Sequence, residues 1–579
     1  MRKIINTDVL VIGGGGAGVR AALEAANLGA DVTIALKGKI GASGSSSAEL
    51  SEISGYNAYM GLNPEDSRNS FIEDILIAGE GMCNEKLVRI LAEKADESVR
   101  DLERYGVNFE KQDGQYMVFK CCFSRFARAL TLFRQGRQII EVLGRIVKEN
   151  KKVQILERIF VADLIVDGNI CLGAIGINKN GEIIILRAKN VILATGGFGG
   201  IFQNRIVPND VMGCGHAMAL RGGAELVNLE FFQMGFASLY PQRTLLESWL
   251  WDLYPLMKNG VGKEFLANYL PPNIDSKGCF SAHGAHFPFS TRDAGMFLDI
   301  SSHSEVLEGR GSLHGGVFLD FTFCDDKYVE KRGKDNPALE TFWKKSYERL
   351  RSKGIDILKE PLEVGIFSHA TNGGVRINEK AESTIMNLFA IGEVSGGVHG
   401  SDRLGGNMLA TCQVFGKIAG VEAALRSRNT TIQVNKDLEG DITERIRVLK
   451  ENLSSHEGED TYQRINAIRS QMSKAALVIR TKKRIEEALH YLDDCKEILG
   501  RKLLAKDLFS VFELRNMIDT ASALLIAIHE RRESRGAHFR ADYPKRDDKE
   551  WAKNMVLFRD KNSFGSEVSI KSKEVILSA

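Results

Sequence analysis

The stretch Asp8-Val-Leu-Val-Ile-Gly-Gly-Gly-Gly-Ala-Gly18 decides the fold. Its apolar part, residues 9–12, is rich in β-branched side chains and predicts a fully buried strand. Residues 17–28 then predict a helix. At the junction stand three glycines with the spacing G-x-G-x-x-G, namely Gly13, Gly15 and Gly18.

Each glycine of this strand–turn–helix unit has a physical role. The first makes the tight turn, the second lets the backbone approach a pyrophosphate, and the third lets helix and strand pack closely. The helix N-terminus offers N–H donors and the positive end of its dipole to phosphates. A second apolar strand is predicted over residues 31–36. The sequence therefore predicts a dinucleotide-binding domain.

Size and charge limit the other possibilities. A chain of 579 residues is too long for one core and predicts two to four lobes. Hydrophobic residues make up 44% and charged residues 26%, which is typical of globular proteins. The net charge of +2 gives no attraction to nucleic acid, so no nucleic-acid partner is expected.

The nine cysteines are scattered and include no C-x-x-C motif, and the adjacent pair Cys121-Cys122 has no ligand spacing. We expect reduced, buried thiols in a cytoplasmic protein, and no zinc, iron–sulfur or haem site. No apolar run reaches about 18 residues, so no transmembrane segment is expected. The first strand begins near residue 8, which leaves no room for a signal peptide.

A loop rich in glycine and serine follows the second strand, over residues 38–47. Lys37 precedes it, at the place where many dinucleotide sites carry an acid that binds a ribose hydroxyl. The loop is either a flexible connection or a set of N–H and hydroxyl donors along the edge of a flavin. We adopt the second interpretation, with cofactor contacts from Lys37, Ser43 and Ser45.

Residues 64–150 predict mostly helices, clearest at 84–105 and 138–150. Residues 153–191 predict a meander of short strands. Its last strand leads into a turn of small residues that suits backbone approach to a cofactor, namely Ala194, Thr195, Gly196 and Gly197. From residue 236 the composition shifts toward aromatic residues and histidine, which predicts an inserted lobe. From about residue 435 the sequence is charged and predicts helices.

Two further motifs identify a family. One joins His369 and Gly373-Gly374 to NLFAIGEVSGGVHGSDRLGGN at residues 387–407; the other is ESRGAHFRADYP at residues 533–544. With the N-terminal glycines, these motifs resemble the flavoprotein subunit of succinate dehydrogenase and fumarate reductase, together with L-aspartate oxidase and relatives. The resemblance covers nearly the whole chain.

The resemblance implies an α/β fold with a Rossmann-like, split FAD-binding domain at residues 1–235 and 356–430. It implies an inserted α+β capping domain at residues 236–355 and a helical C-terminal domain at residues 435–579. Some relatives attach FAD to a histidine in the early loop. Residues 42–47 contain none here, so we expect FAD to be bound non-covalently.

The resemblance also assigns cofactor contacts. Glu393 matches the carboxylate that binds the FAD ribose in this family. The segments 194–197 and 405–409 match its flavin-contacting backbone. The expected contacts in the second segment are Gly405, Asn407, Met408 and Leu409.

The family transfers hydride between flavin N5 and a carbon beside a carboxylate, and a proton is exchanged at the neighbouring carbon. Arg292 matches the family's proton-shuttling arginine, while His369 and Arg403 match the pair that binds the substrate carboxylate. A guanidinium suits the second task because it makes bidentate, charge-assisted bonds to carboxylates. From residue types alone, Arg292 could be an ion-pairing residue, Arg403 a phosphate anchor and His369 a core histidine.

Several residues depart from the family pattern. Gly235 replaces the histidine of a His-Pro-Thr motif, and Cys214 replaces an FAD-contacting aspartate. Glu247 is a candidate for an absent relay glutamate. We expect three aromatic residues to make the pocket more apolar, namely Phe236, Trp249 and Trp251. The resulting hypothesis is a substrate with one carboxylate and a bulkier apolar part, such as an aryl or alkyl enoate.

We therefore expect an FAD-dependent oxidoreductase that acts on CH–CH bonds and exchanges electrons with a separate partner, either an iron–sulfur subunit or a small flavoprotein. Through that partner it could be peripheral on the inner membrane. Two alternatives stay open. One is a flavin oxidase similar to aspartate oxidase; the other is a non-catalytic electron-transfer or assembly subunit, because the His-Pro-Thr and relay residues are missing.

Overall fold

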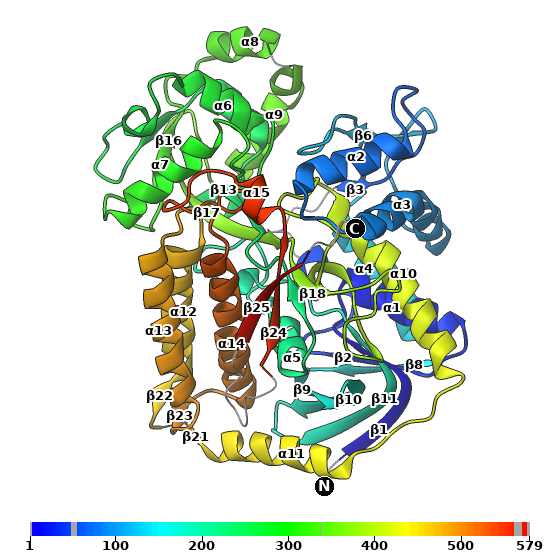
Figure 1. Ribbon diagram of the computed structural model, residues 1–579. Coiled ribbons are helices and arrows are strands. Elements are labelled where there is room, and N and C mark those ends of the chain that lie inside the picture. The colour runs from blue at the N-terminus through cyan, green and yellow to red at the C-terminus, as the bar shows by residue number, and fades with distance from the viewer. Residues whose placement is uncertain (1–2, 48–54, 336, 455, 561–569, 576–579) are drawn as a thin grey trace.

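The computed structural model describes residues 3–47, 55–335, 337–454, 456–560 and 570–575. Three bodies are visible in Figure 1. A blue and teal lobe is built around the sheet that contains β1, a green lobe lies at the top, and an orange group of helices stands at the left. We call them the nucleotide lobe, the cap and the helical lobe.

A seven-stranded sheet forms the centre of the nucleotide lobe. Its order is β8-β2-β1-β11-β10-β9, and β19 also pairs with β11. The strands next to β1 are parallel to it, whereas β10 and β9 form an antiparallel extension. The bounds are β1 Lys3–Ile12, β2 Val32–Leu36, β8 Val153–Glu157, β9 Ile159–Asp167, β10 Ile170–Asn178, β11 Ile183–Leu193 and β19 Leu388–Ala390. The predicted meander is confirmed in β9 to β11.

Helices cover this sheet, with α1 and α10 packed against each other. A Cβ atom at Gly420 would lie 2.4 Å from the carbonyl oxygen of Ala21, so these two helices need glycine at their closest approach. By length and composition α10 could cross a membrane, but 67% of its apolar window is buried inside the protein. The helices of this lobe are α1 Gly16–Asn27, α2 Arg68–Gly79, α3 Glu85–Tyr105, α4 Gln135–Glu149, α5 Cys214–Arg221 and α10 Asn407–Ser427.

The cap is built on a second sheet with the order β14-β13-β17-β16-β15. Its two long strands, β13 and β17, are antiparallel neighbours that carry the chain out of the nucleotide lobe and back. The cap strands are β13 Phe232–Tyr240, β14 Thr244–Leu245, β15 Leu256–Lys258, β16 Val317–Asp320 and β17 Leu362–Thr371. Its helices are α6 Ser276–Gly284, α7 Met296–Leu307, α8 Asp326–Asp335 and α9 Pro337–Ser352.

The C-terminal part is helical at first, as predicted, but not at its end. Its helices are α11 Lys436–Glu451, α12 Thr461–Ala476, α13 Lys482–Ile498, α14 Leu508–Glu530 and the short α15 Asp548–Trp551. Two strands follow, β24 Asn554–Arg559 and β25 Ile570–Val575. They extend a sheet in which β24 pairs with β12 of the nucleotide lobe, because Met555, Val556 and Leu557 are buried there.

Short strands complete the fold. They are β3 Gly55–Asn57, β4 Lys111–Gln112, β5 Gln115–Tyr116, β6 Val118–Phe119, β7 Ala129–Thr131, β12 Leu226–Val227, β18 Gly374–Arg376, β20 Ser395–Gly396, β21 Leu453–Ser454, β22 Glu459–Asp460 and β23 Leu503–Leu504. All nine cysteines are free thiols; six are buried, as predicted, whereas Cys121, Cys122 and Cys214 are partly exposed.

Candidate active site

A long cavity begins where β1, β2 and β11 end and extends to β17 of the cap. Most of the predicted site residues line it: Gly13, Gly15, Lys37, Ser43, Ser45, Ala194, Thr195, Gly196, His369, Glu393, Arg403, Gly405, Met408 and Leu409. Four predicted residues lie outside the lining, namely Gly18, Gly197, Arg292 and Asn407. The structure thus brings together residues that are almost 400 positions apart in the chain.

The three motif glycines meet three different demands. Gly13 has φ +110°, and a Cβ atom there would lie 2.2 Å from the carbonyl oxygen of Ala194. A Cβ at Gly18 would lie 2.1 Å from the carbonyl oxygen of Gly13, so Gly18 serves helix–strand packing. At Gly15 a Cβ would meet no described protein atom within 4 Å. Only the middle glycine therefore leaves free space on the cavity side.

This difference gives a prediction for Gly15→Val. The apo protein is expected to fold normally, because the new side chain enters open space. Cofactor affinity is expected to fall by about 10- to 100-fold, the effect of overpacking a close contact by about 1–3 kcal/mol. Equilibrium dialysis of FAD and thermal unfolding of the apo form measure the two effects. Gly440→Ala, a change into open space on α11, is the control. Unchanged FAD affinity in Gly15→Val would contradict this assignment.

Two helix N-termini end at the cavity without a capping side chain. Gly15 precedes α1, and Gly406, with φ +80°, precedes α10. Neither helix has an acidic residue in its first turn. Uncapped N–H groups and the positive end of the helix dipole favour anionic groups of a ligand at both places.

Several buried polar atoms that line the cavity have no hydrogen-bond partner within the described protein. They are Ser45 Oγ, Thr195 Oγ1, His369 Nδ1 and Arg403 Nε. Buried polar groups are almost always satisfied, so these atoms indicate a polar ligand. The glycine cradle, the two helix ends and these atoms together fit FAD. Across the described ranges, no group of three or more His, Cys, Asp or Glu side chains could hold a metal ion.

Lys37 and Glu393 mark two parts of the cavity wall. Lys37 Nζ is 2.6 Å from Glu513 Oε1 of α14 and 3.1 Å from the carbonyl oxygen of Asp210. Glu393 accepts a hydrogen bond of 3.0 Å from the backbone N–H of Thr371, and its burial raises its pKa. A Cβ at Gly197 would lie 2.4 Å from Glu393 Oε1, so Gly197 makes room for this carboxyl group.

Arg403 is 7% exposed and has no carboxylate partner among the described residues. Its Nη2 donates to Gln233 Oε1 at 2.6 Å, and its Nη1 donates to the carbonyl oxygen of Leu404 at 3.0 Å. Gln233 in turn donates to the Arg403 carbonyl oxygen at 3.0 Å. Gln233 was not among the site residues predicted from the sequence. Burial lowers the pKa of Arg403, but the guanidinium stays charged at neutral pH.

His369 lies in the same part of the cavity. Burial, followed by repulsion from Arg403, lowers its pKa to about 3, so the imidazole is neutral at physiological pH. The ring of Phe287 meets it edge-on at 5.7 Å between centroids. A neutral histidine and a charged arginine therefore face the same space.

Arg292 lies beside the cavity and is held by acids that the sequence analysis missed. Its Nη2 is 3.0 Å from Asp402 Oδ2 and 4.0 Å from Glu80 Oε1. Asp402 is fully buried and also accepts a hydrogen bond of 2.7 Å from Ser290 Oγ. Burial raises the pKa of Asp402 to about 6. Its place immediately before Arg403 in the quoted motif was the available signal.

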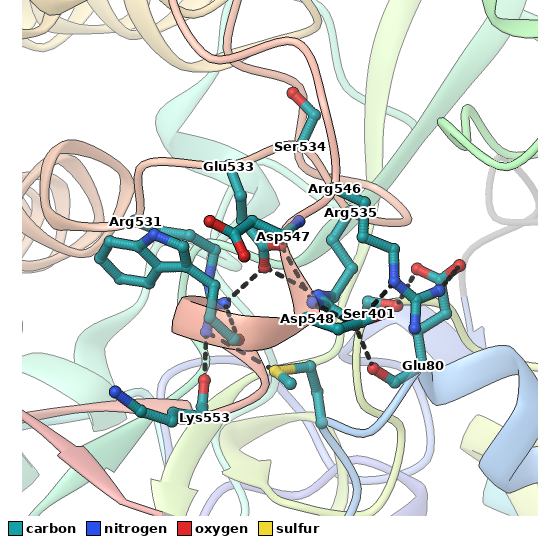
Figure 2. A network of polar contacts seen from close by, with 12 residues as sticks. Glu80, Ser401, Arg531, Glu533, Ser534, Arg535, Arg546, Asp547, Asp548 and Lys553 are labelled. Carbon is teal, nitrogen blue, oxygen red and sulfur yellow. Dashed lines mark hydrogen bonds and ion pairs between the residues drawn. The ribbon is translucent and has the colours of Figure 1, made fainter.

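A buried ionic network ties the C-terminal segment to this region (Figure 2). The side chain of Glu533 is fully buried and accepts from Arg531 at 2.8 Å and from Arg535 at 2.7 Å. Arg535 also donates to the carbonyl oxygen of Glu80 at 2.8 Å. Arg535 thereby docks the C-terminal segment onto the nucleotide lobe. His538 bonds Arg480 of the helical lobe and meets Phe231 edge-on, which also fits docking.

The expected aromatic lining is wrong in its residues. Phe236 and Trp251 pack against each other at 5.0 Å inside the cap and do not line the cavity. Trp249 lies outside the part of the chain whose side chains are described. Glu247 is 3.0 Å from Arg349 and likewise does not line the cavity, so it does not supply the absent relay carboxylate there.

Other apolar residues take that place. Phe287, Pro288, Leu245 and Phe119 line the cavity. A Cβ at Gly235 would lie 3.0 Å from the ring of Phe287, so the glycine that replaces the family's histidine leaves room for this phenylalanine. Cys214, which replaces the expected aspartate, also lines the cavity.

Comparison with known proteins identifies the family. A family described as "FAD binding domain" matches residues 8–409, and one described as "Fumarate reductase flavoprotein C-term" matches residues 465–579. The chain belongs to the fumarate reductase and succinate dehydrogenase flavoprotein family. It is accordingly an FAD-dependent oxidoreductase. The predicted fold class and cofactor are confirmed.

Three relatives show the extent of the similarity. An uncharacterized FAD-dependent oxidoreductase of Methanocaldococcus jannaschii is 34% identical over 96% of each chain. One of the subunits of the fumarate reductase (CoM/CoB) from Methanothermobacter marburgensis is 31% identical over 96% of this chain and 98% of the relative. The structure of Mycobacterium smegmatis Sdh1 gives a TM-score of 0.81 at 27% identity and covers 99% of this chain and 94% of its own.

Proposed function

We propose that this flavoprotein transfers hydride between FAD and a carbon–carbon bond next to a carboxylate. The observation that carries the proposal is Arg403, a buried guanidinium on the cavity wall without an acidic partner in the described protein. When bound, FAD supplies the hydride exchange. A buried charge without a counterion destabilises the protein unless a ligand pairs with it. A substrate carboxylate is the matching group.

Arg403 and His369 are proposed to bind this carboxylate together. The free Nε of Arg403 and the unpaired Nδ1 of His369 are the available contacts. Gln233 accepts a hydrogen bond from the guanidinium and donates one to the carbonyl oxygen of Arg403, so the guanidinium donors are oriented before the substrate binds. Preorganised donors in a site without water polarise the carboxylate and make the far alkene carbon a better hydride acceptor.

Arg292 is proposed to exchange the proton at the neighbouring carbon through its guanidinium group. Its Nη2 donates to Asp402 Oδ2 and to the carbonyl oxygen of Ala78, each at 3.0 Å, and Glu80 Oε1 is 4.0 Å from the same nitrogen. An arginine is a weak acid, so its proton transfer needs an adjacent base in a dry site. We propose that Asp402 takes the position of the relay carboxylate that the family pattern expects elsewhere.

This assignment predicts the pH dependence of turnover. Asp402 is ionised above its pKa of about 6 and becomes protonated as the pH falls through that value. Turnover is therefore expected to decrease as the pH drops below about 6, because the protonated Asp402 no longer holds or neutralises Arg292. Asp402→Asn is expected to lower kcat by about 10²- to 10⁴-fold, the usual contribution of a positioned proton-transfer group. The variant is also expected to lose the acidic limb of the pH–turnover profile, which is the decrease near pH 6.

Stopped-flow measurement of turnover between pH 5 and 8 checks this result. Asp548→Asn, which changes a half-exposed carboxylate of the ionic network, serves as the control and is expected to keep the profile. An unchanged limb near pH 6 in Asp402→Asn would remove Asp402 from the mechanism.

The substrate is proposed to carry one carboxylate and a larger apolar group than fumarate has. Phe287, Leu245 and Phe119 support this because they add apolar surface to the cavity lining, and the ring of Phe287 meets that of His369. Burying apolar substrate surface against them favours an aryl or alkyl enoate.

We make four further proposals, which concern the mode of cofactor binding, the domain limits, the partner and the location. We propose non-covalent FAD, with contacts from the predicted residues, and the domain limits 1–235, 236–355, 356–430 and 435–579. We propose a separate electron-transfer partner, an iron–sulfur subunit or a small flavoprotein, and a cytoplasmic location. Support for a partner comes from relatives named as subunits.

Ligand binding to the oxidised holoprotein tests the carboxylate recognition. We expect 3-phenylpropanoate to perturb the visible flavin spectrum in a saturable way, and 3-phenylpropanamide to have at least tenfold weaker affinity. Arg403→Gln is expected to remove this preference. Equal affinity for acid and amide in the wild-type protein would show that the site does not recognise a carboxylate.

A further inference from the structure

A second cavity, with a volume of about 530 Å³, lies between α12, α14 and the segment 203–212. Three arginines line it: Arg205 in that segment, Arg243 in the turn between β13 and β14, and Arg469 on α12. The rest of the polar lining consists of the carboxylates Asp210 and Glu513 and of uncharged hydrogen-bonding side chains, namely Gln203, Asn209, Tyr462, Asn466, Ser470 and Ser510.

Two of these arginines are almost completely buried without an acid. Arg205 is 8% exposed; its Nη1 donates to the carbonyl oxygens of Phe202 and Gln203 at 3.0 and 2.9 Å, and its Nε and Nη2 donate to Asn209 Oδ1. Arg469 is 9% exposed and donates to the carbonyl oxygen of Gly200 at 3.0 Å. Within the described ranges, no carboxylate lies within 4.0 Å of either guanidinium. Both charges are therefore solvated by neutral acceptors only.

The carboxylates on the cavity wall, Glu513 and Asp210, form no ion pair with Arg205 or Arg469. Glu513 is paired with Lys37 at 2.6 Å, and Asp210 is exposed. Burial, followed by repulsion from Arg469 and Arg243, lowers the pKa of Arg205 to about 10. Buried cations that repel one another are normally compensated by an anion.

We propose that this cavity binds the phosphate of a small phosphorylated molecule between Arg205, Arg243 and Arg469. The planar fork of a guanidinium matches phosphate oxygens bidentately. The cavity volume lies within the range of about 300–1,000 Å³ that small-ligand sites occupy. Tyr462, which is 69% exposed on the rim, offers a ring face for a nucleotide base. The site is independent of the proposed hydride transfer.

Titration calorimetry of the FAD-loaded protein at low ionic strength tests the site. The ligands are AMP, inorganic phosphate and adenosine. We expect saturable binding of AMP and phosphate, with no release of FAD, and at least tenfold weaker binding of adenosine. Tighter binding of AMP than of phosphate assigns a nucleotide, and equal binding assigns free phosphate. The proposal fails if neither ligand binds, if adenosine equals AMP, or if AMP displaces FAD.

Variants place the binding in this cavity. Arg243→Gln changes an exposed side chain and leaves folding intact, while Arg469→Gln changes a buried one. Each is expected to weaken AMP binding about tenfold or more, because each removes a charge-assisted contact. Arg447→Gln, an exposed arginine of α11 away from the cavity, is the control and is expected to bind normally. Wild-type affinity in Arg243→Gln and Arg469→Gln would overturn the proposal.

Discussion

Replacing Arg403 by alanine is expected to lower kcat/KM for the carboxylate substrate by about 10³-fold while FAD stays bound. The side chain supplies several donors to one anionic group, and loss of one preorganised donor alone costs about 10²- to 10³-fold. The guanidinium is buried, so water does not replace it efficiently. Steady-state kinetics with an artificial electron donor measure kcat/KM. The flavin content of the purified variant shows whether FAD stays bound.

Two controls separate the chemistry from misfolding. Arg403→Lys keeps the charge but loses the fork that bonds Gln233 and the Leu404 carbonyl oxygen, so it is expected to recover only part of the activity. Added guanidinium ions are expected to rescue Arg403→Ala partially and not to affect the wild-type protein. Full activity in Arg403→Ala would remove this residue from the site.

Glu533→Gln is expected to lower the free energy of unfolding by about 3–5 kcal/mol, the usual cost of breaking a buried ion pair from one side. Its carboxylate lies between Arg531 and Arg535, and all three side chains are fully buried (Figure 2). The neutral amide removes the counterion that two buried guanidinium groups share, and leaves Arg531 with Glu230 and Arg535 with the exposed Asp548. Denaturant unfolding of the holoprotein, followed by far-UV circular dichroism, gives the loss.

Asp548→Asn is the matched control because Asp548 belongs to the same network but its side chain is 59% exposed. An exposed ion pair contributes about 0–1 kcal/mol, so this variant is expected to unfold close to the wild type. Equal destabilisation by the two substitutions would show that burial does not control the strength of the network.

Local signals made much of the fold predictable. The glycine spacing and the apolar run at residues 9–12 predicted β1 and α1 to within one residue at their junction. The helix predicted at residues 84–105 is α3, because Asn84 caps its start and Gly106, with φ +97°, ends it. These features depend on neighbours in the chain, so they can be seen without tertiary structure.

The site's supporting residues could not be predicted because their partners are distant in sequence. Arg292 and Asp402 are 110 residues apart, and Lys37 and Glu513 are 476 residues apart. The space beside Gly235 is taken by Phe287, which belongs to another segment of the chain and could not be predicted from the residues around Gly235. Strands β24 and β25 were missed because β24 pairs with β12, which is distant in the sequence, and β25 in turn pairs with β24.

The most direct test of the proposed function is anaerobic reoxidation of the chemically reduced holoprotein by enoates. Fumarate, an alkyl enoate and an aryl acrylate would be mixed with it in turn, and the return of the visible flavin band followed. We predict rapid reoxidation by the alkyl enoate or the aryl acrylate, slower reoxidation by fumarate, and loss of both rates in Arg403→Ala. Reoxidation by oxygen alone, with no response to any enoate, would contradict the proposed function and favour an oxidase or a non-catalytic role in assembly.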